Sequence, residues 1–143
     1  MSLKDDIIDY LAGKTAVTNI ITTDVNRLRQ GWTPQGGICP RITINVLEYN
    51  HAHDLGGGAG YAEPDVEIHL WCWKESERDS LGDAVRGVLQ GYSGTMGDTV
   101  VRGVTLPIDN FIDEPWRDGS QRIMHHRIMQ FQFSIVETIP TYA

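Results

Sequence analysis

The sequence lacks any apolar run approaching the roughly 20 residues that a helix needs to span a bilayer. Its first ten residues, MSLKDDIIDY, also lack the basic start and apolar stretch of a signal peptide. From these two absences we expect a protein that is made inside a cell and stays there, at least at first.

Cysteine is scarce as well. The chain has two, Cys39 and Cys72, which lie far apart and form no C-x-x-C pair. A domain of 143 residues buries roughly 68–70% of its unfolded surface, so it does not depend on disulfides for a core. We therefore expect both cysteines to be reduced and structural.

Basic residues are outnumbered by acidic ones, with 12 Lys and Arg against 19 Asp and Glu and a formal net charge of −7 at pH 7. A protein that binds nucleic acid through the phosphates needs clustered Lys and Arg. This composition argues against a nucleic-acid reader. It is compatible with the wall of a passage through which DNA slides without sticking.

The motifs of several enzyme classes are missing too. The sequence has no G-x-S-x-G elbow, no P-loop and no G-x-G-x-x-G between a strand and a helix. The glycine-rich run 56–60 precedes a predicted strand, so no helix N-terminus is available there to hold a phosphate. We predict no enzymatic activity and no cofactor.

Two segments have the spacing of amphipathic helices. Apolar residues recur at helical intervals over about 3–12, which predicts a first helix. A second helix is predicted to begin at Ser76 as its N-cap, with Asp79 at the capping-box distance, and to end at Gly91. Its apolar stripe consists of Leu81, Ala84, Val85, Val88 and Leu89. Between the two, we expect a short helical turn and then an extended piece near 24–28.

Three segments alternate apolar and polar residues with the period of a strand: 41–49, 65–73 and 122–138. Residues 99–116 are predicted to form one strand broken near Pro107 or two short strands, with a hairpin turn around Asp118 and Gly119. The glycine-rich segment at about 50–63 is predicted to be a flexible loop. The order indicates a single α+β domain over 1–143, a mostly antiparallel sheet of four to five strands with two main helices packed on one face.

The sharpest candidate for catalysis is the sequence HAHD, in which His51, His53 and Asp54 follow a predicted strand. It resembles the start of the metal motif of metallo-β-lactamase-like hydrolases, which places its Asp two positions after the second His and adds another His. Leu55 and Gly56 stand at those places. A catalytic metal also needs fixed donors, which a glycine-rich loop does not supply. We therefore predict no metal site and histidines in contact with solvent.

The remaining histidines and aromatic residues lie on predicted strands. Alternation places His69 and Cys72 on opposite faces, and the neighbours His125 and His126 likewise. One of that pair could meet His69 across the sheet, where we expect solvated side chains. Trp71 and Trp73 share a face opposite the apolar row of their strand, so with Trp116 they mark either a protein interface or a surface covered by another part of the chain.

The order of these parts resembles the phage tail-completion family and the tail-terminator proteins similar to it. The resemblance rests on the strand PRITINV, a strand ending in HLWCWKESERD, the helix SLGDAVRGVLQG and a closing strand HHRIMQFQFSIVE, over roughly 1–138. It implies a structural virion protein without catalysis, in a ring, typically hexameric, at the head–tail interface or neck. The implied partners are further copies of the chain, the connector and the tail-tube proteins, with genomic DNA passing through unbound.

This resemblance supplies no site residue of its own. The candidate interface residues are Trp71, Trp73, Trp116, His51, His53 and Tyr61, and the loop at 56–60 would be a docking arm. Two other classes stay open: a small metal-dependent hydrolase using His51, His53 and Asp54, and a monomeric ligand-binding module using the Trp face.

Overall fold

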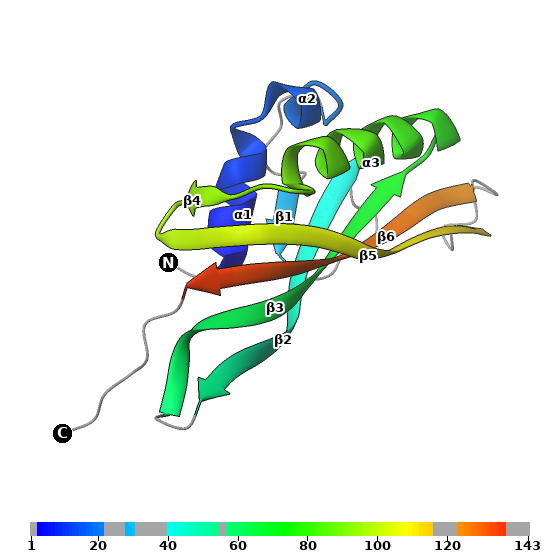
Figure 1. Cartoon of the computed structure of the whole chain (residues 1–143). Coiled ribbons are helices and arrows are strands. Elements are labelled where there is room, and N and C mark those ends of the chain that lie inside the picture. Colours follow the sequence, from blue (N-terminus) through cyan, green and yellow to red (C-terminus); the bar gives the residue numbers. More distant parts are fainter. Residues whose placement is uncertain (1–2, 22–27, 31–39, 55–56, 116–122, 137–143) are drawn as a thin grey trace.

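A computed structural model describes residues 3–21, 28–30, 40–54, 57–115 and 123–136 (Figure 1). Two helices open the chain, α1 (Leu3–Ala12) and the short α2 (Thr15–Thr18), and a third, α3 (Glu75–Leu89), follows in the middle. The strands are β1 (Leu28–Gln30), β2 (Arg41–Asp54), β3 (Gly57–Cys72), β4 (Gly94–Met96), β5 (Thr99–Pro115) and β6 (Ile123–Val136). In these segments, no helix combines the length and apolar character needed to cross a membrane.

The strands form a six-stranded sheet in the order β1-β2-β3-β6-β5-β4. Every neighbouring pair is antiparallel except β1 and β2, which are parallel. The α+β prediction with a mostly antiparallel sheet is confirmed. The four long strands are those with clear alternation, whereas β1 and β4 have three residues each, too few to show a period.

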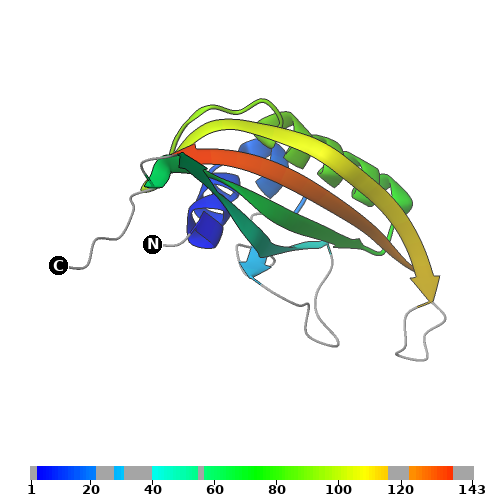
Figure 2. The ribbon, with the colours of Figure 1, turned by 60° about the horizontal axis from the view of Figure 1, so that its bottom comes forward.

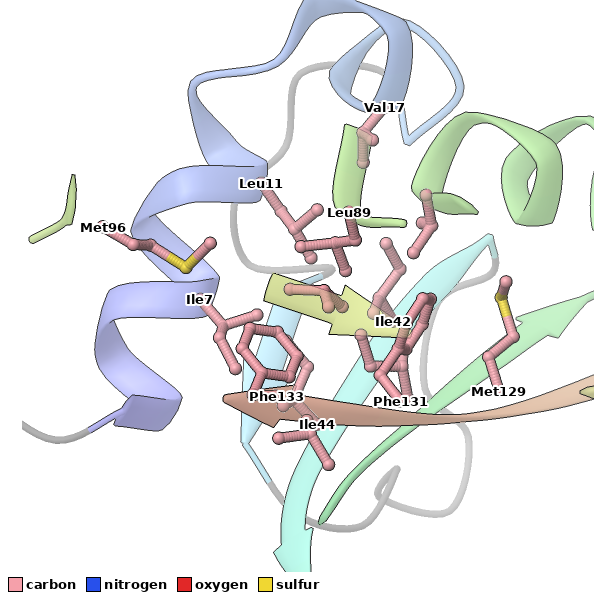
Figure 3. Close-up of a cluster of buried hydrophobic side chains, with 14 of the residues drawn as sticks. Ile7, Leu11, Val17, Ile42, Ile44, Leu89, Met96, Met129, Phe131 and Phe133 are labelled. Atoms are coloured by element: carbon pink, nitrogen blue, oxygen red, sulfur yellow. The ribbon is translucent and has the colours of Figure 1, made fainter. Parts of the chain in front are cut away.

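The helices lie on one face of the curved sheet, and the core fills the space between them (Figures 1 and 2). From α1, Ile7 and Leu11 point toward Ile44, Phe131 and Phe133 of the sheet, all of them fully buried (Figure 3). The predicted stripe of α3 is confirmed, because Leu81, Val85 and Leu89 are buried while Ala84 and Val88 pack at the margin. We call the other side of the sheet the open face.

The alternation in β3 and β6 is also confirmed. Val66, Ile68, Leu70 and Cys72 are fully buried under the helices, and so are Met129, Phe131 and Phe133 of β6. Strand β5 is a single strand whose pairing with β6 shifts between Thr105 and Ile108, around Pro107. The irregularity predicted at Pro107 is therefore a bulge within one strand, because a proline has no N–H to donate to the ladder.

The predictions of a loop at about 50–63 and of a helix that begins at Ser76 were wrong. The loop expected at about 50–63 is largely strand, because β2 continues to Asp54 and β3 begins at Gly57. Helix α3 begins at Glu75, with Lys74 at the N-cap and no side-chain cap, so Ser76 lies inside the first turn. The predicted end of the helix is confirmed by Gly91, whose φ of 80° suits glycine. The loop 31–39 and the turn at Asp118 and Gly119 lie outside the described residues.

Candidate functional site

The predicted interface residues do not gather in one place. Trp71 is 7% exposed, Trp73 is half-buried, and Trp116 lies outside the described residues. His51 and His53 both lie in β2, where the pairing with β3 shifts between them. The side chain of His51 is exposed, and that of His53 is outside the described set. Tyr61 is 37% exposed at the start of β3.

Trp71 belongs to a stacked cluster on the open face. Its indole lies parallel to the ring of His126 on β6, with centroids 3.9 Å apart and 13° between the planes. Its Nε1–H donates to Oγ1 of Thr43 on β2 at 3.1 Å. Trp71 faces Arg41 on one side and His126 on the other in the strand register. The indole N–H of Trp71 is thus hydrogen-bonded and its aromatic surface is covered within a single chain.

His69 joins this cluster and links it to a carboxylate. Its Nε2 contacts Oε1 of Glu67, and its Nδ1 lies 2.7 Å from Nε2 of His126. The Glu67 carboxylate accepts from Nε2–H of His69, and Nδ1 of His69 and Nε2 of His126 share one hydrogen bond whose donor depends on the tautomers of the two rings. The expectation of solvated cross-strand histidines was wrong, since His69 is 5% and His126 6% exposed.

Burial, followed by the electrostatic interaction with His69, lowers the pKa of His126 from 6.5 to about 4. His126 is therefore neutral at physiological pH. The Glu67–His69–His126 chain contains no hydroxyl, thiol or amine side chain. Across the described residues, no group of three or more His, Cys, Asp or Glu side chains is placed to hold a metal ion.

A second polar cluster lies under the N-terminal half of α3. We call β5 from Thr105 to Pro115 together with the facing part of β6 the β5–β6 arm. On its helix-facing side, Arg127 is 3% exposed and makes a bidentate pair with Asp109 at 2.8 and 2.6 Å. This pairing is the largest cause that raises the pKa of Arg127.

Arg78 of α3 completes this contact. Its Nη1 donates to Oδ1 of Asp113 at 2.7 Å, and the same oxygen lies 2.8 Å from Nδ1 of His125. The hydrogen bond with His125, followed by the charge of Arg78, lowers the pKa of Asp113. The ring of Phe111 lies between the two guanidinium groups, 5.0 Å from that of Arg78 and 4.5 Å from that of Arg127. The arm is thus held to α3 mainly by ion pairs and cation–π contacts.

Despite these contacts, the outer strand of the arm exposes large apolar side chains. Ile108 is 42%, Phe111 52% and Ile112 40% exposed. Ile112 pairs with His126, and Ile108 with Gln130, so both lie on the open face. Phe111 pairs with Arg127 and lies on the helix-facing side. Exposed apolar side chains therefore occur on both faces of one strand.

A second exposed apolar group lies at the other end of the open face. Tyr61, Val136 and Val100 are direct register partners on β3, β6 and β5. Val136 is 47% and Val100 44% exposed, which makes a short apolar row across three strands. Of the predicted interface residues, Tyr61 is the one that this row includes.

The fold itself has a known counterpart. It is shared with a virion chain. That chain comes from a solved structure described as the virion of a native gene transfer agent (GTA) particle. The match has a TM-score of 0.69 at 12% sequence identity and covers 94% of this chain and 95% of that chain. No family model and no curated protein matches the sequence. At this identity the likeness shows the fold alone.

Sequence patterns missed the two polar clusters and the exposed strand of the arm. The one available signal for the arm was the apolar spacing of Ile108, Phe111 and Ile112, which fits neither face of a strand buried on one side. Arg127 and Asp109 lie 18 positions apart and Arg78 and Asp113 lie 35 apart, and only the strand order brings each pair together.

Proposed function

We propose that this chain is a structural virion protein of a tailed phage or phage-like particle, a tail-completion or tail-terminator subunit that forms a ring at the head–tail interface. The observation that carries the proposal is the fold match, which extends over nearly the full length of both chains. A match of 94% and 95% coverage leaves little of either chain outside the shared architecture.

The surface is consistent with assembly. Exposed apolar side chains form two separate groups, one on the arm and one in the row of Tyr61, Val136 and Val100. A head-to-tail contact needs two different surfaces on one chain, whereas a two-fold dimer needs only one. The proposed partners are other copies of the chain, the connector and the tail-tube proteins, and the proposed location is the neck of the virion.

Acidic residues on the open face are compatible with a surface that lines a passage for DNA. Glu48 and Asp65 are direct register partners on β2 and β3, and Glu67 lies farther along the same face. Like charges placed opposite each other reduce sheet stability, so such a pair is retained at a cost to the fold. In a ring, a surface of this kind would repel phosphates and let DNA pass without being bound.

Native mass spectrometry of the purified chain over a range of concentrations tests the proposal. The chain has a mass of 16.0 kDa, and a hexameric ring would have six times that mass. We expect a closed oligomer of one stoichiometry, either alone or after addition of the connector or tail-tube protein. A chain that stays monomeric at high concentration and with both partners present would refute the proposed ring.

The hydrolase alternative has its own test. Metal analysis of protein purified without chelator would reveal stoichiometric zinc, manganese or iron if His51, His53 and Asp54 formed a catalytic centre. The exposed position of His51, and the register shift that separates it from His53, do not favour a fixed set of donors.

A further inference from the structure

The outer edge of the β5–β6 arm has no strand beside it in the part of the chain that the structure describes. Strand β4 pairs with β5 only over Thr99–Val101, and the N–H of Gly91 donates to the carbonyl oxygen of Val104 at 2.9 Å. From Thr105 to Pro115, β5 pairs with β6 on one side and with no described strand on the other. Such an edge is a template for a strand from another chain.

The apolar side chains of this edge indicate the kind of contact it fits. A protein docking on one face of the sheet would cover side chains of that face alone. A strand added at the edge places its own side chains beside those of both faces, because side chains alternate along it. Ile108 and Ile112 on the open face and Phe111 on the other match the second arrangement.

Strand β1, at the opposite edge of the same sheet, is in register with the arm. The strand registers join both edges in continuous rows across the sheet. One row consists of Leu28, Ile42, Leu70, Arg127 and Phe111, and the next of Arg29, Thr43, His69, Ile128 and Asn110. A neighbouring copy can therefore bring its β1 to the arm without any shift along the strand direction.

Strand direction and charge agree with this pairing. Strand β1 is parallel to β2, and the antiparallel steps from β2 through β3 and β6 make β5 run opposite to β1. Two copies in the same orientation would thus meet as an antiparallel pair. The arm segment 108–114 contains no Lys or Arg that would repel Arg29 of β1. Of its acidic residues, Asp109 and Asp113 already pair with Arg127 and Arg78, and Glu114 remains on the open face.

We propose that the arm edge of β5 in one copy of this chain pairs with β1 of the next copy, so that the sheets continue from subunit to subunit. The proposal rests on the proposed ring and names its contact. Head-to-tail contacts form a ring when rotation alone relates the copies, and a helical filament when a shift accompanies the rotation. Because the two edge strands are in register, the pairing needs no shift between copies, and it therefore favours a closed ring over a filament.

Disulfide cross-linking between two variants tests the contact, in a Cys39→Ser background. Asn110→Cys and Arg29→Cys lie in one row at the two edges. After oxidation we expect a covalent dimer when the two single variants are mixed, and a ladder of covalent oligomers for the double variant. Arg29→Cys mixed with Asn19→Cys, an exposed position on the helical side, is the matched control and should give no dimer.

The outcomes distinguish a failure of the proposed contact from a failure of the proposed ring. A native ring without the mixed cross-link would overturn the contact and leave the ring standing. Cross-linking of Asn110→Cys with itself would indicate a two-fold pairing of arms and would also overturn the proposed contact with β1. A chain that is monomeric by native mass spectrometry under all conditions would overturn both.

A pair of charge variants gives a second readout that does not depend on cysteine chemistry. Asn110→Lys places a cation at an exposed position of the arm edge, in the row of Arg29, which it would face in the proposed pairing. We expect the concentration at half-assembly to rise at least tenfold while the circular dichroism spectrum stays unchanged. Leu47→Lys, which is exposed on β2 and lies away from the arm, should leave the concentration at half-assembly within about twofold of the parent value; equal effects of both variants would contradict the proposed contact.

Discussion

Gly82 lies directly against the guanidinium group of Arg127, so that a Cβ at Gly82 would overlap it. The glycine lets α3 approach the β5–β6 arm closely enough for Arg127 to lie buried beneath the helix. A residue that is usually unfavourable within a helix is thus required by the ion pair below it.

Gly82→Ala should therefore destabilise the protein. We expect the free energy of unfolding to fall by about 1–3 kcal/mol, because the methyl group must displace the guanidinium or the helix. Gly87→Ala is the matched control in the same helix, where a Cβ meets nothing within 4 Å. There alanine should stabilise by about 0.5–1 kcal/mol. Urea unfolding of both variants measures the difference, and a neutral or stabilising Gly82→Ala would contradict the close contact.

Asp109→Ala should leave the buried guanidinium of Arg127 without its bidentate partner. Removing one member of a buried ion pair costs about 3–5 kcal/mol, because the remaining charge stays buried. Asp83 also approaches Arg127, at 3.6 Å, but its side chain is 76% exposed. Asp83→Ala should therefore change the stability by no more than about 0.5 kcal/mol. Similar losses in both variants, measured by chemical denaturation, would argue against the buried pair.

The lowered pKa of His126 predicts a pH dependence with a defined sign. The folded pKa of about 4 lies below the ordinary value of 6.5, so the unfolded chain binds the proton more readily. The contribution of neutral His126 is complete above about pH 6.5 and is lost as the pH falls toward 4. Allowing for screening by solvent, we expect a loss of about 1–2 kcal/mol over this window.

His126→Phe tests this assignment, because the ring on Trp71 remains while the titration is removed. The decrease in stability between pH 6.5 and pH 4 should become shallower than in the parent protein. Gln132→Phe, on the same face of β6 and without a titratable group, is the control and should keep the parent slope. The contribution of Asp113 is lost only below its ordinary pKa of 3.8, outside this window. An unchanged slope in His126→Phe would refute the prediction.

Thr99 holds a buried carboxylate of α1. Its Oγ1–H donates to Oδ2 of Asp6 at 2.5 Å, and Asp6 is only 1% exposed. Thr99→Val should cost about 1–3 kcal/mol, since it removes a donor from a buried charged acceptor. Thr105→Val, at an exposed position of the same strand, should stay within about 0.5 kcal/mol. Thermal unfolding of the two variants decides whether this bond ties α1 to the sheet.

The sequence allowed the core to be predicted better than the polar clusters. The alternation predicted for the β6 segment matches the burial of Met129, Phe131 and Phe133, because burial on one face imposes a period of two on a strand. Which open-face residues meet is decided by strand order, and β3 pairs with β6 across more than 50 intervening residues. The burial of His69 and His126 therefore had no local signal. Short edge strands such as β1 lack the length to show any period.

The covering of Trp71 within one chain has a consequence for the order of events in assembly. Its indole is already stacked on His126 and hydrogen-bonded to Thr43 in the isolated subunit. Folding therefore does not wait for a neighbour to shield this aromatic surface. In the proposed ring, a newly made chain would be complete before it meets another copy, so the rate of assembly would depend on collisions between finished chains.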